Sequence, residues 1–268
     1  MHLSRASRLL LRAGTAVTLA FLYLPLLVIA LYAFNSRRTL KWPIPGLTLD
    51  WFGRAFDNPG VREALWTSLR AAAGATAIAL VLGTLASLAV ARHRFFGRET
   101  ISFLVILPIA LPGIVTGMAL NSTFTQVLGV ELGLFTVIAG HATFCIVIVV
   151  NNASARLRRM SSTAEEASTD LGATPWTTWR LVTFPALRGA LLAGALLAFA
   201  LSFDEIIVTT FTAGPGLQTL PLWIFQNLFR PNQSPIVNVA AVVLVLISVL
   251  PVYLANRLSG DSAGAVTK

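Results

Sequence analysis

Charged residues are scarce in this chain of 268 residues. Asp, Glu, Lys and Arg together make up 12% of it, whereas hydrophobic residues make up 56% and the mean hydropathy is +0.76. An average soluble domain carries roughly 25% charged residues, which cover much of its surface. So little charge excludes an ordinary water-soluble protein and indicates that lipid surrounds most of the chain.

Cysteine, histidine and lysine are also rare, and each shortage excludes a kind of chemistry. The single cysteine, Cys145, cannot form a disulfide within the chain, and with three scattered histidines it offers no metal-ligand cluster. A nucleotide-binding P-loop requires a lysine after its glycines, but the only lysines are Lys41 and the terminal Lys268. We therefore expect no catalytic residues, no metal and no cofactor in this chain.

The charge that is present is mostly positive, with a net charge of +9 and a pI near 11.2. In a soluble protein this balance would suggest nucleic acid as a partner. No Lys/Arg-rich run with interleaved aromatic residues occurs, however, so we expect contact with membrane lipid and none with nucleic acid.

Six mostly apolar runs are close to the roughly 20 residues that a helix needs to cross a bilayer. The sequence therefore predicts an all-α membrane protein with six transmembrane helices. The fourth run is short, and the fifth contains two acidic residues. The predicted spans are residues 14–34, 71–91, 101–120, 134–150, 190–213 and 236–255.

Orientation follows from the distribution of Lys and Arg. The side that holds both termini carries 13 of these residues and the opposite side carries 7, so the positive-inside rule places both termini in the cytoplasm. The prediction divides the chain into a cytoplasmic segment 1–13, a transmembrane domain 14–256 and a cytoplasmic tail 257–268. A cleaved signal peptide is the alternative for the first run, but 21 residues exceed the usual h-region of about 7 to 15.

The outer loop between the first two spans has signs of order. Pro43, Pro45 and Gly46 interrupt the chain, Thr48 can cap a helix, and 50–56 contains an amphipathic turn with Trp51. An equally good interpretation is that its aromatic residues form only a membrane-interface belt.

Nearly 40 residues separate the fourth and fifth spans, more than a simple connection needs. Ser162 and Thr163 each precede a glutamate by three residues, which is the spacing of a capping box. Gly172 stands where a left-handed helix cap is expected, and Thr174 with Pro175 can start a second helix. We predict two short helices outside the membrane, over residues 163–184, the second one ending at Pro185.

This segment resembles the EAA motif of the permease subunits of ABC importers, in which Glu-Ala-Ala is followed by three residues, Gly, nine residues, Ile, one residue and Leu-Pro. The spacing matches throughout, with Ser, Val and Phe in place of the third Ala, the Ile and the Leu. The resemblance implies the type I ABC importer permease architecture, with this helix pair docked on an ATPase subunit. The implied coupling residues are Glu166, Ala167, Ser168, Gly172, Val182, Phe184 and Pro185.

Asp204 and Glu205 lie within the fifth span, where ionisable residues are costly and suggest function. Neighbouring residues on a helix point about 100° apart, so we expect one of them to line a solute pathway, together with Thr209. The alternative is a broken span in which Asp204 caps the break. Which of the two acids faces the pathway stays open.

The stretch from Ser202 to Phe211, with 214–221 after it, is similar to the second permease subunit of spermidine/putrescine importers, and 107–117 resembles the same branch. The resemblance implies an inner-membrane permease for a small cationic solute. Its partners would be an ATPase dimer that binds ATP and Mg²⁺, a second homologous permease and a periplasmic binding protein. The alternatives are import of another small solute such as 4-aminobutyrate, or an ion-coupled secondary transporter.

Three further features have mainly structural interpretations. Pro108 and Pro112 are expected to kink the third span, and Gly113 and Gly117 form a face for close helix packing. His141 is expected to be a buried packing residue rather than a proton relay.

Overall fold

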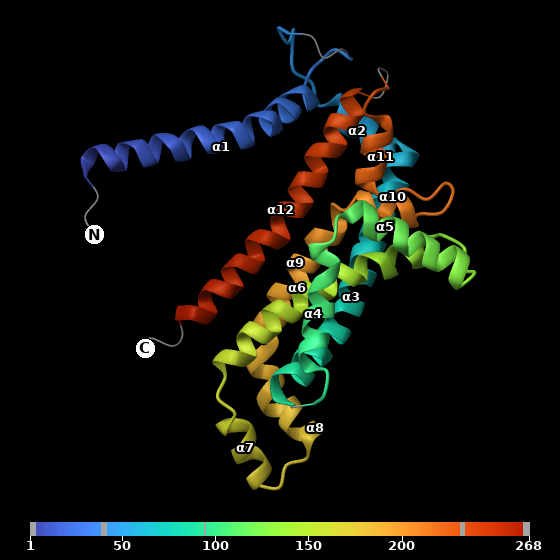
Figure 1. The fold of residues 1–268 in the computed structure, drawn as a ribbon. Coiled ribbons are helices and arrows are strands. Elements are labelled where there is room, and N and C mark those ends of the chain that lie inside the picture. The colour runs from blue at the N-terminus through green and yellow to red at the C-terminus, as the bar shows by residue number, and fades with distance from the viewer. Residues whose placement is uncertain (1–3, 39–41, 94, 231–233, 265–268) are drawn as a thin grey trace. The chain divides into compact units, whose positions relative to one another are not determined.

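The computed structural model describes residues 4–38, 42–93, 95–230 and 234–264, and Figure 1 draws them as a ribbon. Side chains are described up to Arg257, apart from Ser234. Lys41, Arg94, Lys268 and the two ends of the chain, all counted in the orientation prediction or in the terminal segments, lie outside the described residues.

The described residues form helices and no strand; the extended pairing among them is one isolated bridge between Asn35 and Leu47. Five helical segments are long and apolar enough to cross a membrane, and a sharply bent pair of helices makes up to six. These are α1 (Arg5–Ala33), α3 (Pro59–Arg92), α6 (Leu134–Arg159), the continuous segment Pro175–Phe203, α12 (Ser234–Gly264), and the bent pair α4 (Arg98–Ala110) with Gly113–Val127.

The third predicted span is broken rather than kinked. Helix α4 ends before Pro112, and α5 (Gly113–Ser122) with η1 (Thr123–Val127) leaves at 107° to it. A residue before proline disfavours the helical conformation, and Leu111 is extended, with ψ at 144°. Pro108, in contrast, stays inside α4. The expectation of one kinked helix over 101–120 was therefore wrong.

The second predicted cytoplasmic helix does not end at Pro185. α8 (Pro175–Thr178), the π-helical turn η2 (Trp179–Thr183) and α9 (Phe184–Phe203) follow one another without a break. Proline normally breaks a helix because its ring meets a carbonyl one turn earlier and it lacks an N–H. The wider π turn directly before α9 relieves both problems, since Pro185 falls in the first turn of α9.

The fifth predicted span is interrupted. Asp204 and Glu205 follow the end of α9, and the chain becomes helical again in α10 (Ile207–Thr212). The broken span, weighed as the alternative, is the one that the structure contains.

The chain forms two compact units. The first unit, residues 4–62 with 224–244, contains α1, α2 (Asp50–Asp57) and the first residues of α12. Its core surrounds Trp51, which is buried and donates its indole N–H to the Asn35 carbonyl at 2.7 Å. Thr48 Oγ1 accepts the N–H of Asp50 at 3.1 Å at the start of α2. The described part of the loop before α3 is therefore an ordered element, and Trp51 is a core residue rather than part of an interface belt.

The second unit, residues 63–223 with 245–264, has its core between α6 and α9. Cys145, Val149, Leu157, Leu187 and Ala198 are among its buried residues. Figure 1 shows α7 (Thr163–Asp170) and α8 at one end of this helix pair and α5 and α10 toward the other. The two candidate sites below occupy these two ends of the unit.

Candidate functional site

Helix α7 begins without the capping box that the sequence predicts. Ser162 occupies the N-cap, but its side chain accepts no N–H from the first turn. The N–H of Thr163 bonds to Ser161 Oγ at 3.1 Å, and Glu166 N bonds to the Ser162 carbonyl at 2.9 Å. Ser162 has helical dihedral angles, φ −70° and ψ −16°, rather than the extended backbone of a capping residue, and the Glu165 carboxylate is engaged by residues outside α7.

The other end of α7 has the cap that the sequence predicts. Gly172 has φ at +81°, and its N–H bonds to the Thr169 carbonyl at 2.9 Å, while Ala173 N bonds to the Ser168 carbonyl at 3.1 Å. This pair of bonds is a Schellman motif, which ends a helix and reverses the chain. Thr174 Oγ1 then accepts the N–H of Thr177 at 3.3 Å, and α8 begins at Pro175. Both predicted caps at this turn are confirmed.

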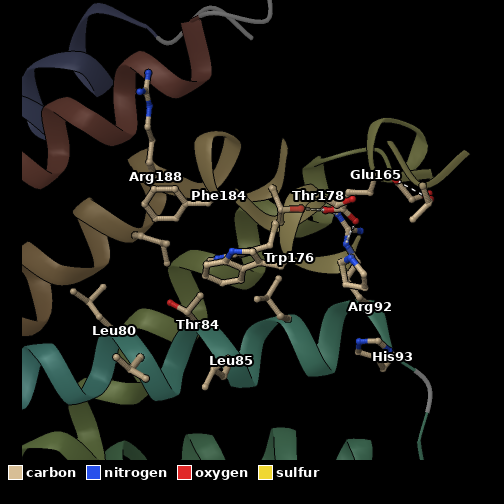
Figure 2. Close-up of a pocket in the computed structure, with 18 of the residues that line it drawn as sticks. Leu80, Thr84, Leu85, Arg92, His93, Glu165, Trp176, Thr178, Phe184 and Arg188 are labelled. Carbon is tan, nitrogen blue, oxygen red and sulfur yellow. Dashed lines mark hydrogen bonds and ion pairs between the residues drawn. The ribbon is translucent and has the colours of Figure 1, made fainter. Parts of the chain in front are cut away.

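Glu165 attaches α7 to two other elements. Its carboxylate lies 2.9 Å from Arg92 Nε and 3.2 Å from Arg92 Nη2, at the end of α3, and accepts a hydrogen bond from Thr183 Oγ1 in η2 at 2.9 Å. Figure 2 shows Arg92 and Glu165 side by side at the edge of the groove described below. Sequence reasoning missed Glu165 because it attends to the adjacent Glu166. The available signal was Arg92 at the end of a span on the same predicted side.

The motif residues that the resemblance implicates are presented outward. Glu166, Ala167 and Gly172 are exposed, and so is Leu171, which is 88% accessible as a residue. Ser168 is partly buried and bonds to Thr178 Oγ1 at 3.0 Å. The outward face of α7 thus has no covering within the described chain. The remaining motif residues, Val182, Phe184 and Pro185, lie on η2 and in the first turn of α9.

An open groove of about 1230 Å³ lies beside this element, between α3 and the segment α8–α9. Its walls are mostly apolar, and Figure 2 shows Thr84 of α3 on the side of that helix that faces Trp176 and Phe184. The Arg92–Glu165 pair lies at its edge. The groove therefore separates two membrane helices that Glu165 links at one end.

At the opposite end of the unit, the two acids of the broken span have different surroundings. Asp204 ends α9 with its N–H on the Ala200 carbonyl at 3.3 Å, and its side chain is exposed. Glu205 is partly buried, and its Oε1 accepts the N–H of Val208 at 2.8 Å. The residue that caps α10 is therefore Glu205 rather than Asp204, the residue named in the broken-span alternative, because the orphan N–H groups that need a cap follow the break.

Thr209 is fully buried within this chain, with no exposed surface, and its hydroxyl lies 2.9 Å from His141 Nε2. The other ring nitrogen of His141, Nδ1, lies 2.8 Å from Ser202 Oγ. Both nitrogens of the imidazole are thus occupied, and the packing interpretation of His141 agrees with the structure. Of the three residues predicted to line a pathway, Asp204 is the one with an exposed side chain.

Helix α10 packs closely on the two neighbouring helices. A methyl group on Gly117 of α5 would come within 2.6 Å of Phe211 Cδ2, so only glycine fits there. Asn121 Nδ2 donates to the Phe211 carbonyl at 2.6 Å, and Thr136 Oγ1 of α6 donates to the Thr212 carbonyl at 2.7 Å. These contacts support the packing role of Gly117 and hold α10 after the break.

Comparison with known proteins agrees with this architecture. Residues 62–260 match the family described as binding-protein-dependent transport system inner membrane component. The chain is 34% identical over 232 residues to the putrescine transport system permease protein PotI of Escherichia coli K12, covering 84% of this chain and 82% of that protein. It is 32% identical over 254 residues to the spermidine/putrescine transport system permease protein PotC of the same strain, covering 94% and 95%.

Among solved structures, a chain of a bacterial ABC transporter involved in the import of the acidic polysaccharide alginate has the same fold. The TM-score is 0.72 with 16% identity, covering 98% of this chain and 96% of that one. An ion-coupled secondary transporter does not agree with these matches. The chain belongs to the family of binding-protein-dependent transport system inner membrane components, as a permease subunit of an ABC importer.

Proposed function

We propose that this permease forms half of the pathway by which an ATP-driven importer carries a small cationic solute, a polyamine of the putrescine or spermidine type, across the inner membrane. A second homologous permease would supply the other half. The relatives named above are polyamine permeases, and Asp204 presents an exposed carboxylate at a break in a membrane helix. A dehydrating ammonium group requires such a negative charge nearby in a medium of low dielectric.

The observation that carries the ATP-driven part is α7. It is a capped helix whose outward face is uncovered, and Glu165 attaches it to α3 and η2 at once. An ATPase subunit that docks on Glu166, Ala167 and Gly172 would move both elements together. ATP and Mg²⁺ would be bound by the ATPase dimer.

The proposal places α7 and both termini in the cytoplasm, since 13 of the 20 Lys and Arg residues then lie inside. The loops on the opposite side would receive solute from a periplasmic binding protein. ATP binding would close the ATPases, move α7 and switch the access of the pathway from one side to the other.

The test is to assemble the complex with its co-encoded partners in liposomes and measure ATPase stimulation by the binding protein loaded with putrescine, spermidine or 4-aminobutyrate. The unloaded binding protein is the control. Stimulation and uptake with the polyamines are expected. A response to 4-aminobutyrate alone would replace the proposed solute by that amino acid, and a response only to an anion or a sugar would overturn the cationic proposal.

A further inference from the structure

A chain of buried hydrogen bonds crosses the break between α9 and α10. His141 on α6 contacts Ser202, in the last turn of α9, and Thr209, in α10. His141 and Thr209 have no exposed surface, and Ser202 is 3% exposed. One imidazole from a third helix therefore connects the two halves of the interrupted span.

One arrangement of protons gives every donor in this chain of bonds an acceptor. Thr209 has one hydroxyl proton and donates it to the Glu205 carbonyl at 3.0 Å, so its oxygen accepts from His141 Nε2–H. A neutral imidazole then has a free lone pair on Nδ1, which accepts the proton of Ser202 Oγ. The chain runs from Ser202 through His141 and Thr209 to the Glu205 backbone. Each of its donors has an acceptor, as a buried network requires.

The same bonds hold the chain on both sides of Asp204. Before it, Ser202 bonds to His141, and after it, the Glu205 carbonyl bonds to Thr209, which in turn bonds to His141. Glu205 is held a second time, because its carboxylate caps α10 through Val208 N. The backbone of 202–205 is thus closed into a ring that leaves one acidic side chain exposed, that of Asp204.

We infer that His141 is a positioning residue, which holds the α9–α10 break and thereby fixes the direction in which the Asp204 carboxylate faces. The inference rests on the proposed function in one respect, namely that the solute passes Asp204. His141 itself is buried and meets no solute. Its neutral ring suits the place, since a charged group without a partner is costly to bury.

The first experiment measures the position of residue 204 directly. In a Cys145→Ala background, Asp204→Cys is labelled with a nitroxide and the assembled complex is examined by electron paramagnetic resonance. His141→Phe keeps a ring beside Phe144 but removes both hydrogen bonds. The label is expected to reorient faster in this variant, because the break loses both hydrogen bonds to the imidazole. A label at Ser162→Cys, at the start of α7 and outside the proposed docking residues, is the control and is expected to keep its spectrum.

Two gentler variants keep the inference testable where His141→Phe fails to fold. Ser202→Ala and Thr209→Val each open one link of the ring, and each is expected to mobilise residue 204. The double variant is expected to be no worse than the more severe single one, because a ring that is open at one link is already open. Unchanged label spectra in all of these variants would overturn the inference.

The second experiment uses complexes that retain Asp204 and compares solute uptake with ATPase activity. His141→Phe is expected to lower polyamine uptake about fivefold, while the loaded binding protein still stimulates the ATPase. Uptake equal to that of the unaltered complex would refute the positioning role. Absence of polyamine uptake in the unaltered complex would instead overturn the proposed solute, and the label at position 204 would still decide the role of His141.

Discussion

Helix α7 is attached to α3 by a charged pair, whereas the two sides of the α9–α10 break are joined by neutral hydrogen bonds. Arg92 and Glu165 form a charged pair whose side chains are 22% and 18% exposed. His141, Ser202 and Thr209 form a neutral network that is almost entirely buried. A charged pair near water can loosen and reform, whereas a buried network is either complete or costly. The comparison suggests that α7 is built to shift and the break to stay in place.

The largest effect is expected from Glu166→Lys. This exposed residue lies on the uncovered face of α7, so reversing its charge should abolish docking of the ATPase, with uptake falling by at least about tenfold, the equivalent of 1.4 kcal/mol. Membrane insertion and unfolding temperature should not change. Uptake in proteoliposomes measures transport, and the amount of assembled complex measures docking of the ATPase. Unchanged uptake would remove the coupling role from α7.

The next effect concerns the break. Thr209→Val keeps the volume but leaves His141 Nε2 without a partner, so the free energy of unfolding should fall by about 1 to 3 kcal/mol. Thr210→Val is the matched control, since Thr210 is exposed and its hydroxyl donates to the Ile206 carbonyl, one turn earlier. Urea unfolding in detergent compares the two. Equal stability of both variants would contradict the buried network.

A smaller effect is expected from loosening α7 without altering its docking face. Glu165→Gln removes the charge that holds Arg92, and uptake should fall about two- to fivefold, as expected for a partly exposed ion pair of up to about 1 kcal/mol. The exchange Arg92→Glu with Glu165→Arg should recover part of the loss, because it restores the pair in reverse. No recovery would show that the geometry at Thr183, rather than the charge pair, carries the effect.

The smallest effect distinguishes the charged pair at α7 from the neutral network at the break while both sets of contacts are kept. Raising the ionic strength from about 0.1 M to 1 M shortens the Debye length from about 10 Å to 3 Å. A nitroxide at Ser162→Cys on α7 should become more mobile, by less than about twofold. A nitroxide at Asp204→Cys should be unaffected, because neutral buried bonds are not screened. Equal responses would show that the two regions do not differ in this way.

Pairs of similar residues show how far the sequence could predict this molecule. Gly172 and Thr174 cap their helices as predicted, because caps depend on contacts within one turn. Pro112 ends a helix and Pro185 does not, although both were expected to interrupt one. The difference comes from the π turn before α9, which no local rule predicts.

Two pairs of adjacent acidic residues also show where prediction from the sequence stops. Glu166 was chosen from its motif, but Glu165 is the residue attached to Arg92, 73 positions away in the chain. The broken-span alternative named Asp204 as the cap, but Glu205 caps α10 and the Asp204 side chain is exposed. Motif spacing identifies the turn of a helix that matters, but adjacent side chains point about 100° apart. Which of them meets a partner depends on the packing of distant helices.

The sequence by itself determined the membrane class, the approximate positions of the spans, the family and the turn between α7 and α8. These follow from composition and from contacts between residues close in the chain. The tertiary structure alone decided that Glu165 links α7 to α3 and that His141 closes the α9–α10 break. Both depend on side chains brought together from helices 60 or more residues apart, as the separations of 61 for His141–Ser202 and 73 for Arg92–Glu165 show. A local pattern cannot specify such contacts, because they form only when the helices pack.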